Sequence, residues 1–158
     1  MDFLLPEYKQ LLVLLSKHKV NFMLIGGYAV IYYGYERTTT DIDIWLQPDN
    51  ENRDKLIGAL SEFGIGKKSA DELAKTDFTK PQLFYFGKRP RRIDFLTKIK
   101  GVTYDEAIAE VNHFVYADLK IPIIQYHHLI RSKITNERPQ DKADVEMLQK
   151  IRQLKIKK

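Results

Sequence analysis

The spacing of apolar side chains along this chain changes between the period of a helix and the pattern of a buried strand. From residue 7 to residue 17 apolar side chains recur every three or four positions, which predicts an amphipathic helix. Residues 20–25 then form a short, mostly apolar run that ends at Gly26-Gly27. This run predicts a buried strand that leads into a tight turn.

The same patterns divide the rest of the chain into alternating elements. Further strands are predicted at residues 41–46, 83–86 and 92–96, and one or two short strands at 114–124, interrupted by Pro122. Further helices are predicted at residues 28–35, about 50–63, 104–111, 126–134 and 139–154. The polar stretch 66–80 has poor periodicity and predicts a mobile loop, whereas residues 87–90 contain turn formers that suit a hairpin.

The order of these elements indicates the fold class. Strands and helices alternate early, a hairpin lies in the middle, and helices end the chain, which predicts an α/β (α+β) sandwich with a mixed sheet flanked by helices. A length of 158 residues suits one domain over residues 1–158. Its core is expected at about 20–125 and its C-terminal helical part at about 126–154.

Composition and charge narrow the class of protein. Hydrophobic residues make up 44% and charged residues 30% of the chain, so it can bury a core. The formal net charge of +5 favours acidic partners such as nucleoside triphosphates or nucleic acid. The absence of cysteine excludes thiolate zinc sites and cysteine nucleophiles. The apolar stretch 11–15 is too short to cross a bilayer, so we expect a cytoplasmic protein with no membrane contact.

Three carboxylates are the strongest candidates for chemistry. Asp41 and Asp43 are two residues apart on a predicted strand, so both project from one face. Asp94 lies in the apolar run 92–96, where an acid is out of place on a purely structural strand. If the two strands pair, the three acids can hold Mg²⁺ or Mn²⁺ for phosphoryl transfer, with Asp94 as the general base. A D-x-D pair alone also occurs on plain solvated strands.

Polar residues around the acids suit a phosphate ligand. Gly26 and Gly27 follow a strand and open a helix, so their backbone N–H groups can contact a triphosphate, although a plain tight turn also explains them. Arg37 can pair with phosphate, and Thr39 supplies a hydroxyl just before the acids, where ordinary turn residues are also common.

Taken together, Gly26-Gly27, the segment Arg37-x-Thr39-x-Asp41-Ile42-Asp43 and the later Asp94 resemble the signature of the DNA polymerase beta-like nucleotidyltransferase superfamily. The form of the motif looks most like minimal prokaryotic members related to AbiEii-type toxins. The resemblance implies a mixed-sheet fold, two Mg²⁺ ions held by the three acids, and a nucleoside triphosphate (NTP) held at the Gly-Gly turn. It also raises a toxin–antitoxin or defence setting.

The C-terminal part adds to the resemblance and shows where it departs. Lys133, followed by Asp141 and Asp144, is similar to a helical segment that often closes these domains, which implies that Lys133 reaches the triphosphate. The two Asp residues also suit a first helical turn. Many superfamily members have Ser where this chain has Gly27, and full AbiEii-type toxins are much longer. The acceptor therefore stays open among RNA such as tRNA, protein and a small molecule.

Two other classes of function compete with nucleotidyl transfer. The fold can act as a non-catalytic module that binds a nucleotide or a partner. A glycosyltransferase also uses D-x-D to hold a metal-bound sugar nucleotide, but that class leaves Gly26-Gly27, Arg37 and Asp94 unexplained. The basic cluster of residues 88–92 lies beside Asp94, where it either steers a nucleotide or RNA or is a solvated hairpin tip.

Overall fold

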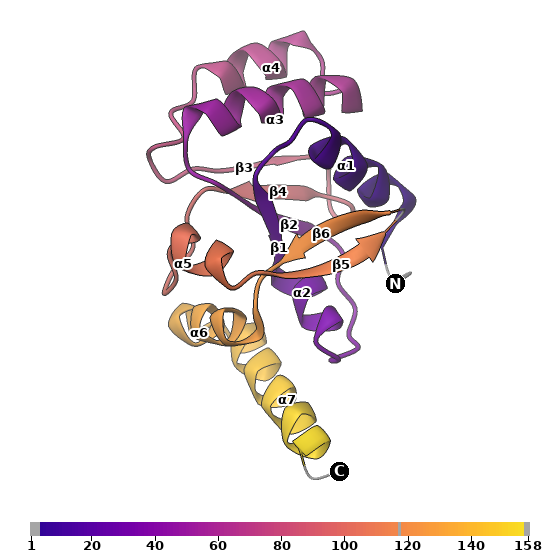
Figure 1. The fold of residues 1–158 in the computed structure, drawn as a ribbon, viewed down its shortest axis with the longest axis vertical. Coiled ribbons are helices and arrows are strands. Elements are labelled where there is room, and N and C mark those ends of the chain that lie inside the picture. Colours follow the sequence, from indigo (N-terminus) through magenta and orange to yellow (C-terminus); the bar gives the residue numbers. More distant parts are fainter. Residues whose placement is uncertain (1–3, 117, 157–158) are drawn as a thin grey trace.

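A mixed six-stranded sheet runs through the centre of the protein (Figure 1). The computed structural model describes residues 4–116 and 118–156. The strands are β1 (Phe22–Ile25), β2 (Ile42–Leu46), β3 (Leu83–Phe86), β4 (Ile93–Leu96), β5 (Asn112–Tyr116) and β6 (Leu119–Ile123). Their order is β3-β4-β2-β1-β6-β5. The pairs β2–β4 and β1–β6 are parallel and the other pairs are antiparallel, which confirms the predicted mixed sheet.

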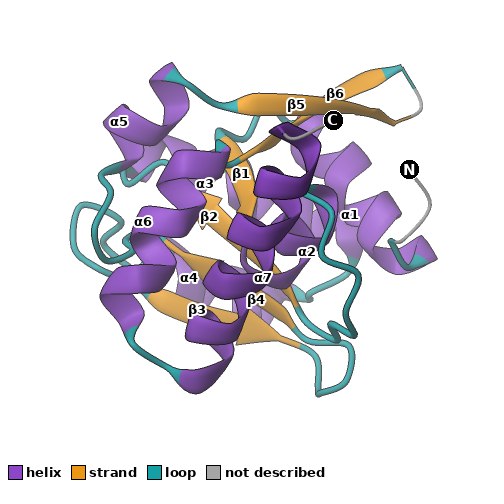
Figure 2. Cartoon of the chain, turned by 90° about the horizontal axis from the view of Figure 1, so that it is seen from below, coloured by secondary structure: helices purple, strands orange, loops and turns teal. Residues whose placement is uncertain are grey.

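Helices cover the sheet on opposite sides. They are α1 (Pro6–Lys17), α2 (Gly26–Tyr32), α3 (Asn50–Phe63), α4 (Lys67–Ala74), α5 (Tyr104–Ala109), α6 (Tyr126–Asn136) and α7 (Pro139–Ile156). In Figure 1 the sheet separates α3 and α4 from α6 and α7, and Figure 2 shows α6 and α7 beside one another across the sheet. The predicted α/β arrangement with C-terminal helices is therefore confirmed.

The core forms where the apolar stripe of α1 meets the buried face of the sheet. Leu11, Leu12 and Leu15 of α1 are fully buried, as their helical spacing predicts. On β2, Ile42 and Ile44 are also fully buried. Each such side chain stabilises the fold by about 1.5–3 kcal/mol relative to an exposed one, so the strand beside the candidate acids is firmly anchored.

The main error of the sequence prediction lies in the stretch 66–80. Its predicted mobile loop is wrong, because residues 67–74 form α4. Only Leu73 of this helix is buried, so the sequence lacks the apolar periodicity that predicts a helix. Contacts from α3 fix the segment instead: Arg53 Nη1 donates to the carbonyl of Thr76 at 3.0 Å, and the Phe78 N–H donates to Asn50 Oδ1 at 2.8 Å.

Smaller differences concern the ends of elements. Helix α2 begins at Gly26 rather than at residue 28, and Asp41 lies one residue before β2. Pro122 lies within β6 rather than interrupting it. β1 pairs with β6 only at Leu24 and Ile123, so the missing N–H of Pro122 breaks no ladder on that side.

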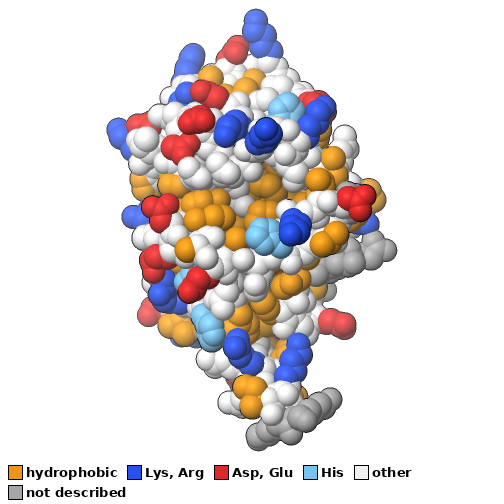
Figure 3. Space-filling view, viewed as in Figure 1, with side chains coloured by type: hydrophobic (Ala, Val, Ile, Leu, Met, Phe, Trp, Pro, Cys, Tyr) orange, Lys and Arg blue, Asp and Glu red, His pale blue; other side chains and the backbone are white. Residues whose placement is uncertain are grey.

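The helices and the surface give two further observations. Between residues 4 and 156, no described helix is long and apolar enough to cross a membrane. On the face shown in Figure 3, acidic and basic side chains are interspersed around α3 and α4. Neither sign of charge dominates that part of the face.

Candidate active site

The three candidate carboxylates converge because β2 and β4 are adjacent and parallel. Asp43 and Asp94 lie directly opposite each other in the register of the two strands. Asp41 lies one residue before β2, and its Oδ1 accepts a hydrogen bond from the backbone N–H of Arg92 at 3.1 Å. We call Asp41, Asp43 and Asp94 the strand acids.

The Gly-Gly turn lies directly against these acids. Gly26 has φ +68°, and a Cβ built there would overlap the Asp43 carboxylate and lie 2.9 Å from its Cγ. A Cβ built on Gly27 would overlap the Thr39 hydroxyl and lie 2.9 Å from Thr39 Cβ. Because any side chain would collide, both glycines are required by close approach. The Thr39 hydroxyl fills the space that a serine in place of Gly27 would enter.

Arginines from the loop between β3 and β4 neutralise two of the strand acids. Arg89 Nε lies 3.1 Å from Asp41 Oδ2. Arg92 donates twice to Asp94, from Nε at 2.6 Å and from Nη2 at 3.0 Å. The sequence places this basic cluster beside Asp94 but does not show which arginine pairs with which acid.

Asp43 differs from its neighbours, because among the described residues it has no ion pair. Burial, together with the nearby charges of Asp94 and Asp41, raises its pKa to about 7. Lys133 and Arg138 lower that pKa only in part. Asp43 therefore lies in a site that is short of positive charge.

A second group of acids joins the C-terminal helices to the site. Lys133 on α6 donates to Asp141 at 3.0 Å and to Asp144 at 2.8 Å, and all three side chains are buried. Arg37 contacts Asp144 through Nε at 2.8 Å and Nη2 at 3.0 Å. Arg138 donates from Nε to Asp141 at 2.6 Å. We call Asp141 and Asp144 the helix acids; each has at least two cationic partners.

Two cavities meet at the strand acids. One has a volume of about 400 Å³, and its lining includes Gly27, Arg37 and Thr39. The other has a volume of about 660 Å³ and extends along β3 and β4 past Leu96. Asp43 and Asp94 line both, and so does Lys133. All eight site residues that the sequence singles out thus lie in or beside one continuous cleft.

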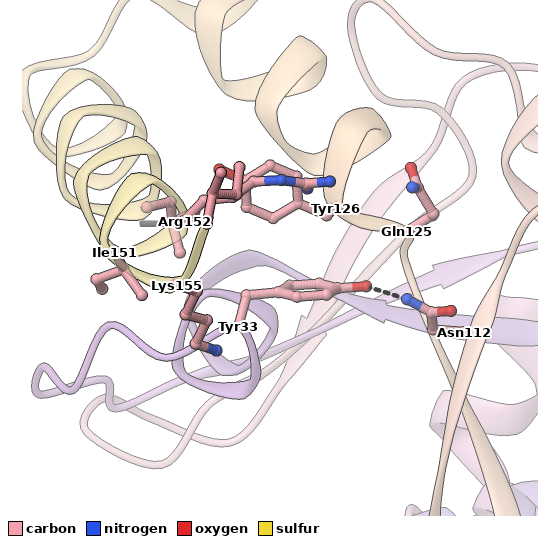
Figure 4. A pocket seen from close by; sticks show the side chains of 9 residues that line it. Tyr33, Asn112, Gln125, Tyr126, Ile151, Arg152 and Lys155 are labelled. Carbon is pink, nitrogen blue, oxygen red and sulfur yellow. Dashed lines mark hydrogen bonds between the residues drawn. The ribbon is translucent and has the colours of Figure 1, made fainter. Parts of the chain in front are cut away.

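Another cavity, of about 460 Å³, lies apart from the acids (Figure 4). In it the Asn112 amide donates to the Tyr33 hydroxyl at 2.7 Å, and the guanidinium of Arg152 lies 4.3 Å from the centre of the Tyr126 ring. Among the described residues, no carboxylate lines this cavity. It therefore lacks the groups that phosphoryl transfer needs.

The strand acids fit a hard divalent cation by their chemistry. Carboxylate oxygens are the ligands that Mg²⁺ prefers, and the charge shortage around Asp43 is what a bound cation would relieve. In residues 4–116 and 118–156, however, no group of three or more His, Asp or Glu side chains is arranged to hold a metal ion. Asp41 is paired with Arg89 and Asp94 with Arg92 instead.

Comparison with solved structures identifies the fold. Lincosamide antibiotic adenylyltransferase LnuA, solved with lincomycin bound, matches with a TM-score of 0.54 and 20% identity over 90% of this chain and 94% of that chain. The Thermotoga maritima protein TM1012, named a putative nucleotidyltransferase, matches with a TM-score of 0.53 and 16% identity over 97% of this chain and 95% of that chain. ANT(2")-Ia in complex with adenylyl-2"-tobramycin matches with a TM-score of 0.56 and 13% identity over 89% and 84%.

The sequence of the chain matches a family that covers almost all of it. No curated protein matches the chain. The profile of one family covers residues 5–158, which is nearly the whole sequence and includes every residue of the cleft. The chain therefore belongs to the family described as nucleotidyl transferase of unknown function (DUF2204).

Proposed function

We propose that this protein transfers a nucleoside monophosphate from an NTP to a hydroxyl group, with Mg²⁺ or Mn²⁺ held by the strand acids. The observation that carries the proposal is the juxtaposition of Asp43 and Asp94 in register, directly beside the Gly26 turn. A bound divalent cation would supply charge stabilisation for the phosphoryl group and orient it. Membership of a nucleotidyl transferase family supports the same reaction.

Each part of the cleft has a proposed role. The backbone N–H groups of Gly26-Gly27 contact the triphosphate, because neither residue has a side chain of its own and the turn lies directly against the acids. Arg37 is held by Asp144 and presents its guanidinium to the phosphates. Lys133 uses two of its three donors on the helix acids, which leaves one N–H for the nucleotide. Thr39 keeps Gly27 and Arg37 at a fixed spacing, since Thr39 and Arg37 both lie against Gly27.

Asp94 is the proposed general base. Its carboxylate is oriented by two bonds from Arg92, and release of one of them would free an oxygen for the proton of the acceptor hydroxyl. Replacement of Asp94 by Asn should lower kcat about 10²- to 10⁴-fold while NTP binding persists. Loss of NTP binding in that variant would show that Asp94 is indispensable for holding the metal and would leave its role as general base without support.

The direct test is calorimetric titration of each of the four NTPs with and without Mg²⁺. Wild-type protein should bind at least one NTP only with the metal, and the Asp41→Asn/Asp43→Asn variant should bind more than about tenfold more weakly. Asp54→Asn is the matched control, because it removes a carboxylate from the exposed surface of α3. A folded wild type that binds no NTP would contradict the proposal.

The main alternative is a binding module without catalysis. It would show metal-dependent NTP binding but no release of pyrophosphate in the presence of any acceptor. The antibiotic adenylyltransferases with this fold suggest a small-molecule acceptor for this chain. RNA or protein acceptors, the AbiEii-like branch and a toxin or defence setting remain predictions.

A further inference from the structure

A separate cavity adjoins the cleft at the far end of β2 and β4. Its volume is about 400 Å³. Trp45 and Tyr104 form its aromatic part, with their rings edge to face at 5.3 Å and with only 1% and 4% of their surfaces exposed. Apolar residues such as Val102 add to the wall, and the exposed Lys80 and Lys98 lie at its rim. The size and lining are those of a pocket for a small molecule.

Two polar atoms of these aromatic side chains have no hydrogen-bond partner among the described residues. Trp45 Nε1 and the Tyr104 hydroxyl are buried, and neither makes a hydrogen bond to any residue that the structure describes. An unsatisfied buried donor costs about 1–3 kcal/mol. Since the indole N–H can only donate, a ligand that relieves this cost must bring an oxygen or another acceptor to Trp45.

The register of the sheet joins this cavity to the strand acids. Asp43 and Trp45 are two residues apart on β2, so they share one face and lie about 7 Å from each other along the strand. Leu96, opposite Trp45 in register, lines the cleft that contains Asp94. Lys98 and Ile99 line both the cleft and the cavity. A molecule seated against Trp45 therefore extends along the sheet towards the acids.

We propose that this cavity binds the body of the hydroxyl acceptor, a compact ring-containing small molecule that carries an acceptor oxygen for Trp45 or Tyr104. The inference rests on the proposed nucleotidyl transfer and names its acceptor class. In the reaction, the acceptor hydroxyl oxygen forms a bond to the α-phosphorus of the NTP. The bond from that phosphorus to the bridging oxygen breaks, pyrophosphate leaves with the electron pair, and Asp94 takes the hydroxyl proton.

Trp45 provides the readout, because it is the only tryptophan in the chain. The probes are 4-nitrophenyl β-glucoside and 4-nitrophenyl β-galactoside, whose nitrophenyl ring quenches indole fluorescence and whose sugar carries free hydroxyls. We expect saturable quenching without NTP, after correction with free N-acetyltryptophanamide. Methyl β-glucoside, which lacks the aromatic body, should not compete with the probes.

A pair of matched variants locates the binding. Tyr104→Phe should raise the apparent Kd about fivefold, because it removes one hydrogen-bonding group from the cavity. Tyr126→Phe is the control: its hydroxyl is also buried without a partner among the described residues, but it lines the separate cavity of Figure 4. Equal effects of the two variants, or saturation by neither probe, would overturn the proposal. So would saturable quenching by a short single-stranded RNA alone.

Failure of the proposal and failure of the proposed function give different results. With an α-³²P-labelled NTP and Mg²⁺, label should move to the probe that quenches, and less so in Tyr104→Phe. NTP binding and pyrophosphate release without probe binding would overturn the acceptor cavity but keep nucleotidyl transfer. Probe binding without NTP binding would refute nucleotidyl transfer, and with it the acceptor role of the cavity.

Discussion

The helix acids and the strand acids are both largely withdrawn from water, but the charges around them differ. Asp141 and Asp144 share Lys133, and each has an arginine as well. Burial and the nearby carboxylates raise the pKa of Asp43, which has no ion pair among the described residues, whereas hydrogen bonds from Arg138 and Lys133 lower the pKa of Asp141. A balanced group of buried charges holds helices in place. An unbalanced group is suited to receive a cation or a proton.

The largest expected effect follows from removing one helix acid. Asp144→Asn leaves Arg37 and Lys133 without the carboxylate they share, and loss of one partner from such a buried group costs about 3–5 kcal/mol of unfolding free energy. Urea denaturation measures this loss. Glu146→Gln on the exposed side of the same helix is the control and should leave the midpoint unchanged. A similar midpoint for both variants would show that the helix acids do not stabilise the fold.

An effect of opposite sign, which builds up gradually with pH, is expected at the strand acids. Folding raises the pKa of Asp43 from 3.8 to about 7, so between these pH values the folded state binds more protons than the unfolded state. Stability should therefore fall as the pH rises from about 4 to 7, by at most about 1.4 kcal/mol per pH unit. Asp43→Asn should lack this loss and be the more stable protein at pH ~8.

The measurement is urea denaturation of wild type and Asp43→Asn in EDTA across this pH range, with the difference between the two proteins as the readout. Mg²⁺ added at the alkaline end of the range should raise the stability of the wild type and not that of the variant. A difference that does not change with pH would mean that folding does not raise the pKa of Asp43.

The smallest effect is expected at the edge of the helix acids. The side chain of Arg138 is 73% exposed, and Asp141 keeps Lys133 when Arg138 is removed. Arg138→Gln should therefore lower the unfolding free energy by less than about 1 kcal/mol. A loss as large as that of Asp144→Asn would show that solvent screening is weaker here than the exposure implies.

The strand acids can be predicted from the sequence because their signal is local. Alternation places Asp41 and Asp43 on one side of a strand, and an acid within the apolar run around Asp94 indicates a role other than packing. The three carboxylates converge only if β2 pairs with β4. The sequence does not show whether these strands pair, and the structure confirms that they do. The roles of these residues in catalysis stay predictions.

Several contacts of the cleft could not be predicted from the sequence, because their partners are far apart along the chain. Arg37 and Asp144 are 107 residues apart, and no spacing rule connects them. The sequence shows Arg89 and Arg92 as part of a basic cluster, but their pairing with Asp41 and Asp94 depends on the conformation of the loop between β3 and β4. Helix α4 was missed because only Leu73 of its side chains is buried, so tertiary contacts rather than periodicity define it.

The ion pair between Arg37 and Asp144 also fixes the order in which parts of the cleft form while the chain is synthesised. A ribosome releases the Gly-Gly turn and all three strand acids long before it reaches residue 144. A nascent chain that stops short of that residue lacks the carboxylate that orients Arg37 in the cleft. The side of the cleft that contains Arg37 can therefore assemble only after α7 has begun to form, so partly synthesised chains carry the strand acids without a finished cleft.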